Sequence, residues 1–131
     1  MTDVIDKTEL LEEINGDIEF LNESFEMLEE DAPTLLTAIR SGMESADAEA
    51  IWKNAHTMKS MVGNFYAQPC FDAAYTVETQ GRQGNLEDIG NSIDVLETEM
   101  QKLLAALRDV LMWIELIYYH EAHEDNEGKN I

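Results

Sequence analysis

The sequence is poor in residues that interrupt helices or cross-link chains. Its 131 residues include 2 prolines, 7 glycines and a single cysteine, Cys70. One cysteine excludes an internal disulfide and fits a reducing compartment. No N-terminal apolar run resembles a signal peptide, and the longest apolar run falls far short of the roughly 20 residues of a spanning helix. We therefore expect a soluble, cytoplasmic protein that does not enter a membrane.

Positive charge is also scarce. The chain carries 8 Lys and Arg residues against 28 Asp and Glu residues, which gives a formal net charge of -20 at pH 7. A surface this negative repels the phosphates of nucleic acids and of anionic lipids. We expect this protein to bind neither of them.

Apolar residues recur at helical spacing, and strand-like alternation is absent. We expect a short helix over residues 6–14 and a second from Asp17 that Pro33 either kinks or splits. A third should cover about 48–65, a fourth should start near Pro69 and end near Gly81, and the last should run from about Leu86 to about His120.

The last of these helices has the clearest pattern. Its apolar residues are spaced by threes and fours, which is typical of one buried stripe along a bundle: Ile89, Ile93, Leu96, Met100, Leu103, Leu107, Val110 and Ile114. The chain is thus predicted to be all-α, an antiparallel four-helix bundle with a short additional N-terminal helix and a long C-terminal helix. Residues 1–120 form this domain, and residues 121–131 form an acidic tail that we expect to be disordered.

His56 is the only histidine in the first 119 residues. The core stripe of its helix is Ile51, Ala55, Met58, Val62 and Phe65. At about 100° per residue, His56 lies about 140° from the centre of that stripe, and Lys59 lies on its shoulder. This geometry excludes a core histidine and leaves either a chance surface residue or a functional one.

The neighbours of His56 favour function, although each has a simpler explanation. Lys53 and Lys59 lie three residues away on either side, as neighbours on the helix or as solvated charges. Ser60 and Gly63 are small, which fits either the close approach of a partner or helix packing. Trp52, one turn earlier, fits packing better than docking.

The sequence resembles the histidine-containing phosphotransfer (HPt) domains of two-component phosphorelays. Ala55-His56-Thr57-Met58-Lys59 matches the family pattern Ala-His-x-hydrophobic-Lys. Further similar segments are "LLEEINGDIEFLNESFEMLEEDAPTLL", "DAEAIWKNAH" and "VETQGRQGNLEDI", and the likeness covers about residues 8–111. Two positions depart from the family: Ser60 replaces the glycine after the lysine, and 65–67 replace Leu-Gly-Ala.

The resemblance implies a phosphorelay intermediate. His56 would take a phosphoryl group from the aspartyl phosphate of a receiver domain and pass it to the receiver of another response regulator. A hybrid sensor histidine kinase would be a further partner, and Mg²⁺ would belong to the receiver, so this chain would bind no cofactor. Lys59 would balance the phosphoryl charge, with weaker support from Gln80 and Arg82. Trp52, Lys53, Ser60 and Gly63 would lie at the docking surface.

The chain has no Gly-rich phosphate loop, so we expect no kinase activity of its own. The alternative function is a helical docking module that binds a receiver without taking phosphate. A bundle metal site is disfavoured because no Glu lies three residues before a histidine, and His120 with His123 fits an acidic tail better than a surface Zn or Ni site. Val110 to Tyr119 is apolar on more than one side, which fits a homodimer, contact with a partner protein or further internal packing.

Overall fold

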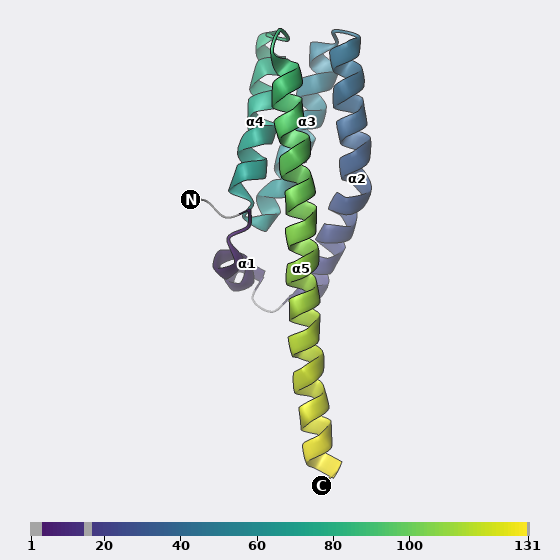
Figure 1. Cartoon of the computed structure of the whole chain (residues 1–131), viewed down its shortest axis with the longest axis vertical. Helices are drawn as coiled ribbons and strands as arrows, with labels where there is room; N and C mark the ends of the chain where they lie inside the picture. Colours follow the sequence, from purple (N-terminus) through teal and green to yellow (C-terminus); the bar gives the residue numbers. More distant parts are fainter. Residues whose placement is uncertain (1–3, 15–16, 131) are drawn as a thin grey trace.

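The computed structural model describes the backbone of residues 4–14 and 17–130, and the side chains of residues 4–12 and 17–116. The elements in chain order are α1 (Lys7–Ile14), α2 (Ile18–Glu44), α3 (Ala48–Val62), the 3-10 turn η1 (Gly63–Phe65), α4 (Gln68–Gln83) and α5 (Ile89–Asn130). The helices α2 to α5 lie side by side, α1 lies near one end of the bundle, and α5 projects beyond it (Figure 1). The predicted all-α bundle with a short N-terminal helix is confirmed.

The bundle core is made by the apolar stripes that the spacing predicts. On α3 the buried residues are Ile51, Ala55, Met58 and Val62, and Phe65 of η1 continues the stripe. On α5 all eight stripe residues from Ile89 to Ile114 are buried. Each large apolar side chain stabilises the fold by about 1.5–3 kcal/mol when it leaves water, so these stripes supply most of the driving force for packing.

Aspartates cap the starts of α2 and α3, and the cap at Asp17 was predicted. The Asp17 carboxylate accepts a hydrogen bond from the Phe20 backbone N–H at 2.9 Å, and Asp47 does the same for Ala50 at 3.1 Å. Pro33 lies within a continuous α2, so the helix is not split. A proline removes one backbone hydrogen bond, and the buried residues Leu28 and Ile39 anchor the helix on both sides of it.

Several helix ends differ from the predicted ones. The third α-helix stops at Val62 instead of Phe65, because the chain tightens into η1 before Tyr66 adopts a left-handed conformation. The fourth continues to Gln83, where Gly84, at φ 70°, forms its cap.

The last helix starts at Ile89 rather than Leu86 and runs to Asn130, ten residues beyond the predicted end at His120. The first glycine after His120 is Gly128, so no strong stop signal precedes it. The disorder expected for 121–131 stays a prediction.

A close contact between α3 and α4 positions the site. A Cβ atom added to Gly81 of α4 would lie 2.9 Å from Trp52 Cβ and 3.1 Å from the Trp52 backbone nitrogen. Glycine at this position therefore lets the two backbones approach. Glu78 lies one turn before Gly81 on α4 and His56 one turn after Trp52 on α3, so the same contact brings these two side chains together.

Candidate functional site

His56 projects from the outer face of α3, as its position relative to the core stripe predicts. Its side chain is 50% exposed. The helix backbone fixes the point at which the His56 side chain is attached, while one edge of the ring faces the neighbouring helix α4. His56 is therefore both held in place and accessible to another protein.

The centre of the site is the carboxylate of Glu78, which is only 5% exposed. One oxygen, Oε2, lies 3.0 Å from His56 Nδ1 and accepts a hydrogen bond from Arg82 Nε at 3.1 Å. The other oxygen, Oε1, lies 2.7 Å from Lys59 Nζ, in an ion pair rather than a directed hydrogen bond. These four residues, His56, Lys59, Glu78 and Arg82, are called the Glu78 cluster below.

The Glu78 cluster keeps its carboxylate ionised. Burial raises the pKa of Glu78, but the contacts with Lys59, Arg82 and His56 outweigh that effect and hold the pKa below its ordinary value. Since a carboxylate can only accept hydrogen bonds, the His56 contact places the ring proton on Nδ1. The lone pair of neutral His56 then lies on Nε2, the ring nitrogen left free by this contact.

The charges in the cluster do not cancel. One carboxylate faces one ammonium and one guanidinium, so with a neutral His56 the local sum is +1. This surplus lies on a chain whose net charge is -20. The cluster is thus a local positive region suited to an incoming anionic group.

Aromatic rings line the edges of the site. Lys59 Nζ lies 5.0 Å from the ring centre of Tyr75 and 5.9 Å from that of Phe71, within cation–π range. Arg82 stacks over Trp52 at 4.0 Å. Tyr75 is exposed and Trp52 is half-buried, so the site combines two held cations with an accessible aromatic surface.

The structure places the predicted docking residues in different environments. Lys53 is exposed, pairs with Glu49 of its own helix and has its Nζ 5.8 Å from the ring centre of Trp52. The Ser60 hydroxyl donates to the His56 carbonyl oxygen at 3.1 Å, which turns it toward its own backbone. Gly63 is exposed, and an added Cβ would lie 3.8 Å from Phe71, an ordinary contact, so internal packing does not require glycine there.

Of the two residues predicted as weak support, only Arg82 joins the cluster. Gln80 follows Glu78 by two residues, which places it about 200° around the helix. Its Oε1 is buried with no hydrogen-bond partner among the described residues, and its side chain takes no part in the contacts of Glu78.

Sequence reasoning missed Glu78. It lies inside the quoted segment "VETQGRQGNLEDI", but the chain has many acidic residues. The available signal was its spacing, four residues after the buried Ala74 and three before the buried Gly81. A carboxylate on a buried, small-residue face of a helix requires a charged partner on the facing helix.

Other features of the described surface do not form a comparable site. No group of metal-ligating side chains occurs among the described residues, and His120 and His123 lie outside those whose side chains are described.

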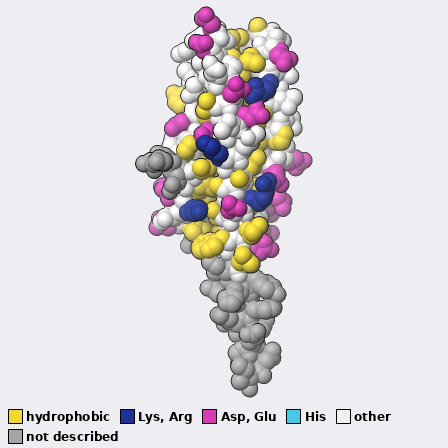
Figure 2. Space-filling view, viewed as in Figure 1, with side chains coloured by type: hydrophobic (Ala, Val, Ile, Leu, Met, Phe, Trp, Pro, Cys, Tyr) yellow, Lys and Arg dark blue, Asp and Glu magenta, His cyan; other side chains and the backbone are white. Residues whose placement is uncertain are grey.

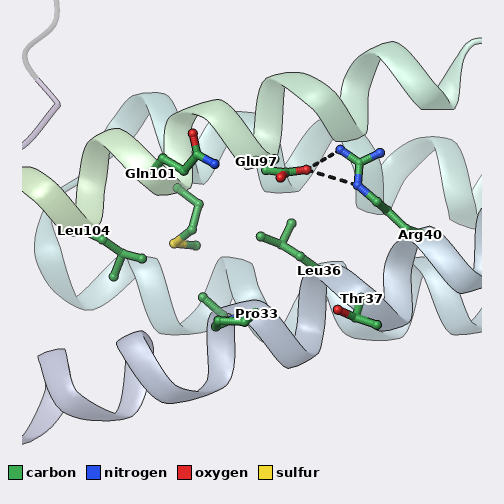
Figure 3. A pocket seen from close by; sticks show the side chains of 9 residues that line it. Pro33, Leu36, Thr37, Arg40, Glu97, Gln101 and Leu104 are labelled. Carbon is green, nitrogen blue, oxygen red and sulfur yellow. Dashed lines mark hydrogen bonds and ion pairs between the residues drawn. The ribbon is translucent and has the colours of Figure 1, made fainter.

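A cavity of about 340 Å³ lies between α2 and α5, but its cation, Arg40, already donates a hydrogen bond to Glu97 (Figure 3). No helix within the described residues is long and apolar enough to cross a membrane.

The apolar C-terminal segment is exposed in part. Met112, Trp113 and Leu116 of α5 are exposed, and hydrophobic side chains gather at the lower end of the described surface (Figure 2). Val110 and Ile114 are buried in the bundle. The side chains of 117–119 lie outside the described residues, so the homodimer through Val110–Tyr119 stays a prediction.

Comparisons with known proteins agree with this fold. The Hpt domain model matches residues 23–109. The structure is similar to the crystal structure of histidine-containing phosphotransfer protein B (HptB) from Pseudomonas aeruginosa PAO1, with a TM-score of 0.76, 18% identity, and coverage of 86% of this chain and 97% of that one. A search of curated protein sequences finds no match. Since the family model covers well over half of the sequence, the chain belongs to the Hpt domain family, whose members carry out histidine phosphotransfer in phosphorelays and are not kinases.

Proposed function

We propose that this chain is a phosphorelay intermediate that accepts a phosphoryl group on His56 from a receiver-domain aspartyl phosphate and passes it to the receiver of another response regulator. One observation carries the assignment: an exposed His56 has its Nδ1 held at 3.0 Å by a buried carboxylate. The free Nε2 lone pair is then a fixed nucleophile on the surface.

Lys59 is the proposed counter-charge for the phosphoryl group. It lies one helical turn from His56, is 21% exposed and already belongs to the Glu78 cluster. A phosphoryl group brings about -1.5 to -2 charge near neutral pH. The local surplus of +1 offsets part of this charge, and Arg82 adds to the support from the facing helix.

The partners follow from the chemistry. Hpt domains interact with receiver domains and kinases in general, and here a receiver and a hybrid sensor histidine kinase are the proposed donors and acceptors. The receiver would supply the aspartate and Mg²⁺. Trp52, Lys53, Ser60 and Gly63, which lie on or directly after the helix that carries His56, are proposed as docking residues, together with the exposed ring of Tyr75.

The test is phosphoryl transfer from radiolabelled, phosphorylated receiver domains to the full chain, with His56→Gln as the control. Acid-labile label on the wild type and none on the control is the expected result. The absence of label on the wild type, with receiver binding still measurable, would overturn the relay function. It would leave the docking module as the remaining function.

A further inference from the structure

Phosphoryl transfer changes the charge of the His56 ring. As Nε2 attacks, the Nε2–P bond forms, the P–O bond to the donor aspartate breaks, and its electron pair stays on the carboxylate oxygen. The proton on Nδ1 takes no part in this exchange of bonds. The phosphorylated ring is therefore an imidazolium with its proton still facing Glu78.

We infer that Glu78 retains the Nδ1 proton on phosphorylated His56, so that the ring departs as neutral imidazole when the phosphoryl group moves to the next receiver. In that step a P–O bond to the acceptor aspartate forms, the Nε2–P bond breaks, and its electron pair returns to Nε2. A ring that had lost the Nδ1 proton would have to leave as an imidazolide anion, which is a far poorer leaving group. This inference rests on the proposed relay function and assigns to Glu78 the role of a positioning residue.

The contacts of Glu78 suit this role. The Nδ1–Oε2 distance is 3.0 Å, Arg82 donates to the same oxygen, and Lys59 pairs with the other one. A carboxylate fixed in this way stabilises the charged ring without moving, as the aspartate does for the imidazolium of a Ser-His-Asp triad. With its proton retained on Nδ1, the ring neither gains nor loses a proton in either direction of transfer.

The cations around the site act against retention of the Nδ1 proton. Lys53 and Lys59 on α3 and Arg82 on α4 are cations, and cations disfavour a positive ring. Tyr75 on α4 contacts Lys59, and Glu49 on α3 is exposed and pairs with Lys53. In the described part of the chain, Glu78 is the only carboxylate with a recorded contact to His56.

The test uses a matched pair of variants, and its main readout, the titration of the ring, does not require a receiver. The full chain is phosphorylated with phosphoramidate, and NMR follows the protonation of the His56 ring with pH, with His56→Gln identifying its signals. Glu78→Gln keeps an oxygen that can accept from Nδ1–H but removes the charge. Glu49→Gln removes a similar charge from an exposed position beside the site.

The ring of phosphorylated His56 is expected to lose its proton at a pH lower by about 1 unit or more in Glu78→Gln than in the wild type. Glu49→Gln should leave the midpoint within about 0.2 unit of the wild type, because exposed charges are well screened. Transfer from the phosphorylated chain to a receiver should decline from a correspondingly lower pH in Glu78→Gln. Equal midpoints for the wild type and Glu78→Gln would overturn the inference.

If the Glu78→Gln variant does not fold, a measurement on the wild type alone still tests the inference. The midpoint of phosphorylated His56 should be higher in the folded chain than in the same chain unfolded in urea. A folded midpoint at or below the unfolded one would also overturn the inference. Failure of the relay function gives a different result, because the wild type would then take no phosphoryl group from receivers whatever its ring titration.

Discussion

Two clusters of charged side chains join pairs of helices in this bundle, and they differ in the group at their centre. In the Glu78 cluster a buried carboxylate of α4 holds His56 and Lys59 of α3. Between α2 and α5, the guanidinium of Arg40 holds Glu97 and Asp94, and its side chain is 36% exposed. The central groups differ in burial, because the Glu78 side chain is only 5% exposed. Water therefore screens the charge of Arg40 more than that of Glu78.

The comparison shows how an acidic chain can build a positive site. Around Arg40 one cation is shared by two carboxylates, so the local sum is -1. Around Glu78 one carboxylate is shared by two cations, which leaves a surplus of +1 next to His56. We expect the first arrangement to contribute only to helix packing and the second to contribute to chemistry as well.

The largest expected effect comes from Glu78→Ala. This change leaves Lys59 and Arg82 without their shared anion and His56 without its Nδ1 partner. The free energy of unfolding should fall by about 1–3 kcal/mol, measured by urea unfolding. Phosphoryl acceptance from a receiver should fall at least several-fold, because both ring tautomers become available. An unchanged acceptance rate would contradict the role assigned to Glu78.

Gly81→Ala tests whether the close α3–α4 contact builds the Glu78 cluster. The added methyl would meet Trp52 at 2.9 Å, and relieving this overlap should cost about 1–3 kcal/mol, more than the gain of about 1 kcal/mol from replacing a helical glycine. Gly90→Ala is the matched control, since its methyl would meet only Met43 Sδ at 3.6 Å. Equal stabilities for the two variants would show that the contact at Trp52 is not tight.

Lowering the pH should reduce the contribution of the Glu78 cluster to the stability of the fold. The pKa of Glu78 is lowered in the folded chain from an ordinary value of 4.5. Its contribution to stability is therefore complete above about pH 4.5 and is lost as the pH falls through the lower, folded pKa. In urea unfolding below pH 4.5, the wild type should lose stability more steeply than Glu78→Gln. Parallel pH profiles of the free energy of unfolding would show that the ionised Glu78 is not stabilised by its contacts.

The smallest effect is expected for Arg40→Ala. The ion pairs of Arg40 are partly exposed, so their loss should cost about 0.2–1 kcal/mol and should shrink further in high salt. Phosphoryl acceptance should match the wild type, because Arg40 takes no part in the Glu78 cluster. A drop in acceptance as large as that of Glu78→Ala would remove the distinction between the two clusters.

Much of the fold could be predicted because it depends on local periodicity. The spacing of Ile51, Ala55, Met58 and Val62 places them on one face of α3, all four are buried, and the same spacing places His56 outside. Helix ends were less predictable. The tightening at Gly63 and the cap at Gly84 depend on single backbone conformations that spacing does not determine.

The partner of His56 could not be predicted from periodicity. Glu78 lies 22 residues away on another helix, and its contact with His56 depends on how closely α3 and α4 approach at Gly81. That approach is a property of tertiary packing, which one sequence does not display. Lys59, one turn from His56 on the same helix, required only local geometry and was therefore found.

The most direct measurement is to identify the nitrogen that carries the phosphoryl group. After transfer from a phosphorylated receiver, ¹H–¹⁵N NMR of the histidine rings distinguishes Nδ1 from Nε2. Phosphorylation of His56 at Nε2, with the proton retained on Nδ1, is the predicted result. A phosphoryl group on Nδ1, or on His120 or His123 in place of His56, would contradict the account of how Glu78 presents this histidine.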